Sequence, residues 1–61
     1  MKKHYNNNPD EVRVVNIIQA KAYILNGLQP LRVEADTERI VFVFDREASY
    51  DLWLKWKARE I

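Results

Sequence analysis

Five consecutive apolar residues, from Ile40 to Phe44, are the feature that most restricts how this chain can fold. Charged Arg39 and Asp45 bound this run, and its β-branched and aromatic content is typical of a strand whose two faces are both dry. A chain of 61 residues has little material with which to cover both faces of such a strand. We therefore expect helices on one face, and the cover of the second face is the open question.

The segment before this run predicts a β-hairpin. Apolar and charged residues alternate from Leu31 to Asp36, as in a half-buried strand. The connection 36–39 contains no glycine, which favours a four-residue connection around a type I turn over a tight primed turn. The resulting register places Val33 opposite Phe42, and a shift by one residue would destroy the match. The predicted apolar face contains Leu31, Val33, Ala35, Ile40, Phe42 and Phe44.

A short strand and two helices complete the expected set of elements. The pattern EVRVVN at 11–16 predicts a strand, and Asn16 is expected to cap the helix that follows. Helical spacing continues to Gly27, the only glycine, where a left-handed residue would end this helix. Asp45 is expected to cap the last helix, which occupies residues 47–60.

These elements predict an α+β fold of the order β-α-β-β-α. A right-handed crossover through the first helix makes the first two strands parallel, and the hairpin makes the third strand antiparallel to the second. The most apolar strand should be central, which gives the strand order 1-3-2 with both helices on the phenylalanine face. Residues 11–61 would form a single domain, and we expect the polar, asparagine-rich leader at 1–10 to be disordered.

The last helix carries two apolar stripes, although a helix with one buried face needs only one. The first stripe is formed by Ala48, Leu52 and Trp56, and Trp53 widens it. The second stripe is formed by Tyr50, Leu54, Ala58 and Ile61. A domain this small gains from a partner, so we expect Tyr50, Leu54 and Ile61 to contact a second copy in a twofold homodimer. The other predicted dimer surface is a valine strip on the second face of the sheet, formed by Val41, Val43 and Val15.

The aromatic and basic segment WLKWKAR predicts the residues that bind another partner. Trp53 is a candidate interface anchor because Trp is enriched at binding hot spots, and Lys57 and Arg59 accompany it. Lys55, Lys57 and Arg59 could instead meet phosphates, which makes a small DNA-binding regulator the alternative function. The charge is nearly balanced, with ten Lys and Arg against nine Asp and Glu, and this argues against a dedicated nucleic-acid binder.

Patterns for catalysis and for metal binding are absent from the sequence. There is no cysteine, and the single histidine, His4, cannot build a metal site alone. No glycine-rich phosphate loop and no nucleophile elbow occurs. We therefore expect no enzyme activity, no cofactor and no metal. No apolar run approaches the roughly 20 residues of a membrane span, which predicts a cytoplasmic protein without membrane contact.

The succession QAKAYILNG, PLRVE, VFVFD and YDLWLKW resembles a small family of uncharacterised domains from Gram-positive bacteria and their phages. The similarity covers Val12 to Lys57, and its motifs are structural, so it assigns no functional residues. The resemblance implies a phage or mobile-element accessory protein that binds and inhibits a host defence protein in the bacterial cytoplasm. The identity of that host protein is not implied.

Overall fold

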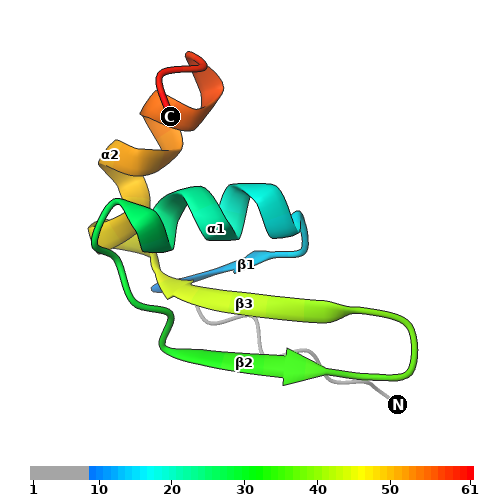
Figure 1. Ribbon diagram of the computed structural model, residues 1–61. Helices are drawn as coiled ribbons and strands as arrows, with labels where there is room; N and C mark the ends of the chain where they lie inside the picture. The colour runs from blue at the N-terminus through cyan, green and yellow to red at the C-terminus, as the bar shows by residue number, and fades with distance from the viewer. Residues whose placement is uncertain (1–8) are drawn as a thin grey trace.

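The computed structural model describes residues 9–61, which form a three-stranded sheet and two helices (Figure 1). The elements are β1 (Glu11–Val14), α1 (Ile17–Leu25), β2 (Arg32–Ala35), β3 (Ile40–Asp45) and α2 (Arg46–Lys57). β3 is central and pairs antiparallel with both β1 and β2. The predicted β-α-β-β-α fold and the strand order 1-3-2 are therefore confirmed. The leader predicted at 1–10 lies outside the described residues except for Pro9 and Asp10.

The hairpin of β2 and β3 has the predicted register, with Val33 opposite Phe42. Asp36 closes its four-residue connection. The Asp36 amide donates to the Arg39 carbonyl at 3.0 Å, and its carboxylate accepts from the amides of Glu38 and Arg39 at 2.8 and 3.0 Å. These bonds to the ionised form lower the pKa of Asp36 below its usual value. The aspartate thus orders a turn that has no glycine.

Side-chain caps start both helices at the predicted residues. The Asn16 side-chain oxygen accepts from the amides of Ile18 and Gln19 at 2.9 and 3.2 Å. The Asp45 carboxylate accepts from the amide of Ala48 at 2.8 Å. Each cap satisfies backbone donors that have no partner inside the helix. Because Asp45 is also the last residue of β3, the chain passes from the sheet into α2 without a loop.

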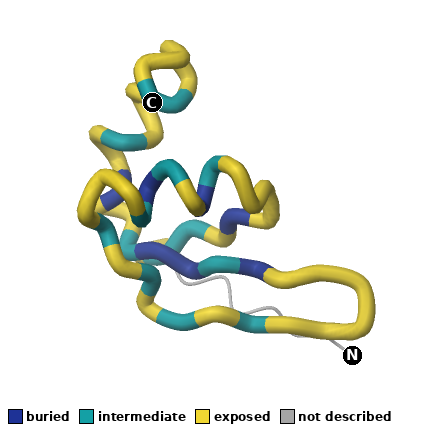
Figure 2. The backbone as a smooth tube through the Cα atoms, viewed as in Figure 1, coloured by how far each residue is buried: buried dark blue, intermediate teal, exposed yellow. Residues whose placement is uncertain are grey.

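The core lies between α1 and the β1–β3 half of the sheet. Tyr23 and Phe44 are 1% and 0% exposed, and their rings meet edge to face with centroids 5.1 Å apart. The Tyr23 hydroxyl accepts a hydrogen bond from Nε2 of Gln19 at 2.8 Å. Figure 2 shows the buried positions on β3 and on the side of α1 that faces the sheet. Val14 and Ala20 complete the buried cluster, and Val12, Ile24, Leu28, Phe42, Leu52, Trp56 and Ile61 pack against it.

The helices leave part of the phenylalanine face uncovered over β2, contrary to the expectation that they cover all of it. Leu31, Val33 and Ile40 are 53%, 52% and 46% exposed, and we call these three the hairpin patch. The backbone of α1 lies closest to β1 and α2 rather than to β2. A helix about 10 Å wide covers about two strands spaced about 4.8 Å apart. Since α2 leaves the end of β3 and extends away from the sheet (Figure 1), no helix of the described chain covers β2.

The second face of β3 is covered within the chain. Val41 and Val43 are 5% and 0% exposed, so the expectation that they form an exposed strip for a second copy is wrong. Arg13 of β1 and Arg32 of β2 stand directly opposite Val43 on its two sides. Long arginine side chains can lay their aliphatic stems over apolar neighbours and keep the charge in water. The charged side chains of the edge strands are thus placed to cover Val43.

Four charged side chains form an ion-pair network across this face: Glu11 and Arg13 on β1, and Arg32 and Glu34 on β2. Arg32 contacts Glu11 through two bonds, at 2.9 and 3.0 Å, and contacts Glu34 at 2.9 Å. Arg13 contacts Glu34 at 2.7 Å. Because β3 lies between β1 and β2, the Arg32–Glu11 and Arg13–Glu34 contacts join the two edge strands over the central one. Hydrogen bonds from Arg32 lower the pKa of both glutamates below the usual 4.5, and the same bonds raise the pKa of Arg32.

Candidate protein-binding surface

The two stripes of α2 have different environments. On the inner side, Leu52 and Trp56 are half-buried against the core, and Ser49 is buried with its hydroxyl donating to the Arg46 carbonyl. On the outer side, Tyr50, Trp53 and Leu54 are 53%, 39% and 43% exposed. We call Tyr50, Trp53, Leu54 and Lys57 the α2 stripe. Their spacing of i, i+3, i+4 and i+7 places all four on one side of the helix.

Contacts within the α2 stripe hold its aromatic side chains in a defined arrangement. The rings of Tyr50 and Trp53 lie with their centroids 5.9 Å apart and their planes inclined by 35°. Nζ of Lys57 lies 4.4 Å from the centroid of the Trp53 ring, within the range of a cation–π interaction. A tryptophan supported in this way loses little side-chain freedom when a partner covers it. The stripe therefore presents a preorganised aromatic surface.

A groove of about 610 Å³ begins at the α2 stripe and continues to the edge of the sheet. Tyr50 and Trp53 form one wall, and Gln19 and Tyr23 of α1 reach the groove from the helix above the sheet. The apolar part of the remaining wall comes from β1 and the residue after it: Val12, Val14 and Val15. Its polar part comes from Arg13, Asn16, Arg46 and Ser49. An apolar hollow with a few polar groups at its margin is the usual form of a binding site.

Arg46 closes the groove at the start of β1. Its guanidinium donates to the carbonyl of Pro9 through Nε and to the carbonyl of Glu11 through Nη2, the latter at 3.1 Å. Its own amide donates to the Asp10 carbonyl at 2.7 Å. Arg46 thus fixes the beginning of β1 against the beginning of α2, and it places a positive charge at the margin of the groove.

The structure brings together some of the predicted site residues and separates others. Tyr50 and Leu54, expected to contact a second copy, share one surface with Trp53 and Lys57, expected to bind another partner. Ile61 does not belong to this surface, because it is half-buried against the core.

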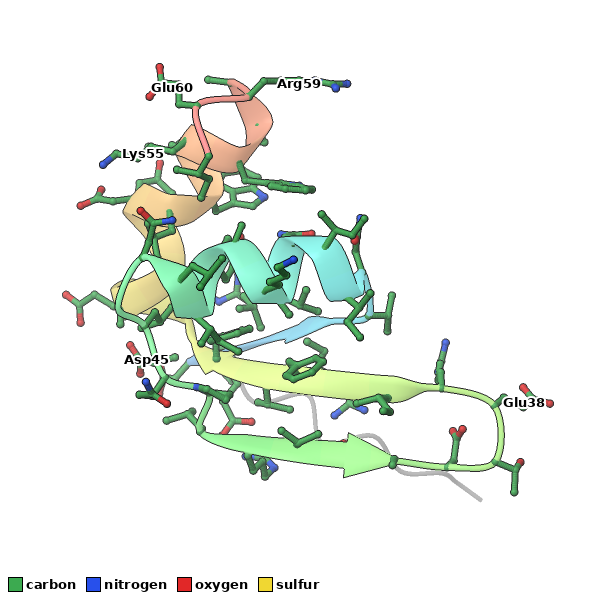
Figure 3. All side chains as sticks on the ribbon, in the orientation of Figure 1. Glu38, Asp45, Lys55, Arg59 and Glu60 are labelled. Atoms are coloured by element: carbon green, nitrogen blue, oxygen red, sulfur yellow. The ribbon has the colours of Figure 1, made fainter. Side chains whose placement is uncertain are left out.

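Arg59, the third predicted partner-binding residue, follows the end of α2 with φ of 61° and lies at the far end of the helix (Figure 3). It does not line the groove. Val41 and Val43 are buried beneath the ion-pair network, as described above.

Sequence reasoning missed the contribution of β1 and α1 to the groove. Val15 follows β1 and Arg46 begins α2, and only the fold brings both to the groove, which no local pattern encodes. Between Pro9 and Ile61, no cluster of His, Cys, Asp and Glu is suited to hold a metal ion. In the same range, neither helix has the length and apolar character needed to cross a bilayer.

Comparisons of the chain with protein-family models, with curated proteins and with solved structures find no match. The resemblance to domains of Gram-positive bacteria and their phages therefore stays a prediction. The case for function depends on the surface described above.

Proposed function

We propose that this chain is a non-catalytic protein-binding domain whose contact surface is the α2 stripe with its adjoining groove. The observation that carries the proposal is the exposure of two neighbouring aromatic side chains, Tyr50 and Trp53, at the wall of an apolar groove. Exposed Trp and Tyr beside a hollow are the groups that dominate binding energy at protein interfaces. Water leaves such a surface readily when a partner with an apolar side chain fills the groove.

Charge indicates the kind of partner segment that fits. Arg46 and Lys57 lie on the same side of α2 as the aromatic pair. Counted from Arg46, the residues Tyr50, Trp53 and Lys57 follow at i+4, i+7 and i+11, which is the spacing of one helix face. The acidic residues of α2, Glu47 and Asp51, lie outside this row. A partner segment with one large apolar side chain flanked by acidic residues would therefore match both the groove and its rim.

The resemblance to domains of Gram-positive bacteria and their phages indicates who the partner would be. On this proposal, the partner is a host defence protein in the bacterial cytoplasm, and binding through the α2 stripe inhibits it. Inhibition requires only that the occupied surface of the host protein be one that it needs. This part of the proposal is supported by the resemblance alone.

The test compares proteins captured from a bacterial lysate by the wild-type chain and by the variants Trp53→Ala, Tyr50→Ala and Lys55→Ala. Lys55 is the matched control, because it is exposed on α2 and its spacing of two residues from Trp53 and from Lys57 places it on another side of the helix. We expect a captured protein to be lost with Trp53→Ala and Tyr50→Ala and kept with Lys55→Ala. Calorimetry with the purified protein should then show binding that Trp53→Ala weakens by about tenfold or more. If Trp53→Ala and Tyr50→Ala both still capture the same protein, the proposal is contradicted.

A gel shift at low salt separates the alternative function from this one. Binding to duplex or single-stranded DNA that declines steeply with salt, and that Lys55→Ala and Arg59→Ala weaken, would support the DNA-binding regulator. That result, together with no captured protein, would replace the proposal made here.

A further inference from the structure

We infer that two copies of this chain pair through the outer edge of β2, antiparallel about a twofold axis at Val33, and form one continuous sheet. This dimer uses neither the α2 stripe nor the groove, so it goes beyond the proposed function and does not depend on it. Four features of β2 carry the inference: the direction of its backbone groups, its charge order, the exposed hairpin patch and the contrast with β1.

The backbone of β2 presents hydrogen-bonding groups outward at the residue on the axis. In an antiparallel ladder, alternate residues bond to the neighbouring strand. The Asp36 amide donates to the Arg39 carbonyl, so Glu34 and Arg32, two and four residues earlier, also direct their amides and carbonyls to β3. Val33 and Ala35 direct theirs away from the sheet. A second copy placed antiparallel can therefore exchange two hydrogen bonds with Val33.

The charge order of β2 selects a single register for this pairing. With Val33 opposite Val33 of the second copy, Arg32 stands opposite Glu34 of that copy, and Glu34 stands opposite its Arg32. Cross-strand pairs of opposite charge stabilise a sheet, and like charges destabilise it. A shift of the register by two residues would place Arg32 opposite Arg32, or Glu34 opposite Glu34. The strand is self-complementary in one register only.

The hairpin patch gains a neighbour in the same register. Because an antiparallel edge pairing about this axis keeps matching faces on the same side, the exposed Val33 meets its own copy. Leu31 precedes β2 and its amide donates to the Val43 carbonyl at 2.7 Å, so it stays outside the new ladder. Val33, which is more than half exposed in one copy, loses water contact at the junction. No helix of the described chain competes for this position, because α1 lies over β1 and α2 rather than over β2.

The other edge strand is unsuited to a second copy. A β1 pairing that sets Glu11 opposite Arg13 needs the outward carbonyl of Glu11, which already accepts from Arg46 at 3.1 Å. The next register sets Arg13 opposite Arg13, a like-charge pair. Edge strands that are blocked by a charged side chain resist pairing with other chains. The two edges of this sheet are therefore not equivalent, and only β2 is open to a copy of itself.

Light scattering coupled to gel filtration tests the dimer with Val33→Pro and Val33→Thr. Proline at this edge position removes the outward amide but no bond to β3, while threonine keeps the amide and the branched shape. We expect wild type and Val33→Thr to show twice the chain mass of 7.3 kDa in the micromolar range, and Val33→Pro to dissociate about tenfold more readily or to be monomeric. A monomeric wild type, a dimeric Val33→Pro, or loss of the dimer in both variants would overturn the inference.

A mixing experiment tests the register and does not require the proline variant to fold. Glu34→Arg gives a strand with two positive charges, and Arg32→Glu gives one with two negative charges. Each variant alone should be monomeric, because like charges would meet at the junction. An equimolar mixture should regain the dimeric mass, since every cross-strand pair is then opposite in charge. Circular dichroism confirms that each variant is folded, and a mixture of folded variants that stays monomeric would overturn the register.

Discussion

At the scale of single residues, Arg32 has the widest influence on the sheet. Its guanidinium binds Glu11 of β1 and Glu34 of its own strand, and it passes over Val43 to do so. Ion pairs between exposed side chains contribute little to stability, so any larger effect of this network must come from more than charge. It also lies over a strand face that no helix or strand between Pro9 and Ile61 covers. One arginine thus combines electrostatic pairing with the role of an apolar cover.

Three carboxyl groups determine how we expect the stability of the fold to change in acid. Glu11 and Glu34 have pKa values lowered by hydrogen bonds from Arg32, and the pKa of Asp36 is lowered by the amides of Glu38 and Arg39. A carboxyl group whose pKa is lower in the folded chain than in the unfolded chain stabilises the fold at every pH above its unfolded pKa. This stabilisation is lost as the pH falls through the folded pKa. We expect a nearly constant melting temperature from about pH 7 to about pH 5 and a fall below about pH 4.5, measured by circular dichroism.

Single substitutions of the two glutamates test whether the ion-pair network causes this loss of stability in acid. Glu11→Gln and Glu34→Gln should each lower the melting temperature at neutral pH and make its decline in acid shallower. Glu38→Gln is the control, since Glu38 lies at the tip of the hairpin and outside the network (Figure 3). An equal melting temperature for the wild-type chain at pH 5 and pH 3 would contradict the prediction.

At the scale of elements, the end of α1 shows how one residue type fixes a helix boundary. Gly27 has φ of 95°, its amide donates to the Ile24 carbonyl at 3.0 Å, and the Leu28 amide donates to the Tyr23 carbonyl at 3.1 Å. These two bonds form a Schellman motif, which requires a left-handed residue. A side chain at Gly27 would meet no atom within 4 Å, so the cost of adding one is conformational rather than steric.

We therefore predict that Gly27→Ala lowers the free energy of unfolding by about 1 kcal/mol. Gly27→Asn should cost less, because asparagine tolerates the left-handed region better than alanine. Urea denaturation followed by circular dichroism measures both differences. Equal effects of the two substitutions, or a stabilising effect of alanine, would show that the motif does not depend on backbone conformation.

The elements that sequence predicts well are those that local rules determine. The hairpin register follows because the apolar alternation and the four-residue connection together place Val33 opposite Phe42, and the helix starts follow from Asn16 and Asp45. The cover of Val43 could not be read locally, because Arg32 reaches Glu11 across a strand between them in space. Spacing predicted the shared outer side of Tyr50 and Leu54, but it assigned Trp53 to the inner stripe and did not predict the groove.

At the scale of the whole molecule, apolar side chains are exposed on separate surfaces with different shapes. The α2 stripe borders a groove, which suits a partner's side chain. The hairpin patch lies on an open strand edge, which suits another strand. If the patch joins two copies, the two grooves of the dimer remain free on the outer parts of the sheet. A partner with two matching segments would then bind with higher avidity than either groove gives alone.

The dimer also predicts how stability depends on concentration. Association with a second folded copy stabilises the native state by mass action, so the melting temperature rises with chain concentration. A 100-fold increase in concentration is expected to raise it by about 10 °C for a domain of this size. The same series with Val33→Pro should show no rise. A wild-type melting temperature that is independent of concentration would contradict the prediction, whatever the mass in gel filtration.

The pairing of β1 with β3, rather than with β2, also has a kinetic consequence during synthesis. β1 is made early, but Glu11 aligns with Asp45, and the Asp10 carbonyl receives its bond from the Arg46 amide. A nine-residue helix such as α1 is marginal without packing, so it gives the growing chain no stable intermediate. Long-range closure must wait until β3 and the start of α2 have left the ribosome. Until then the apolar side chains of α1 have no sheet to pack against, so this domain cannot fold before the start of α2 has been made.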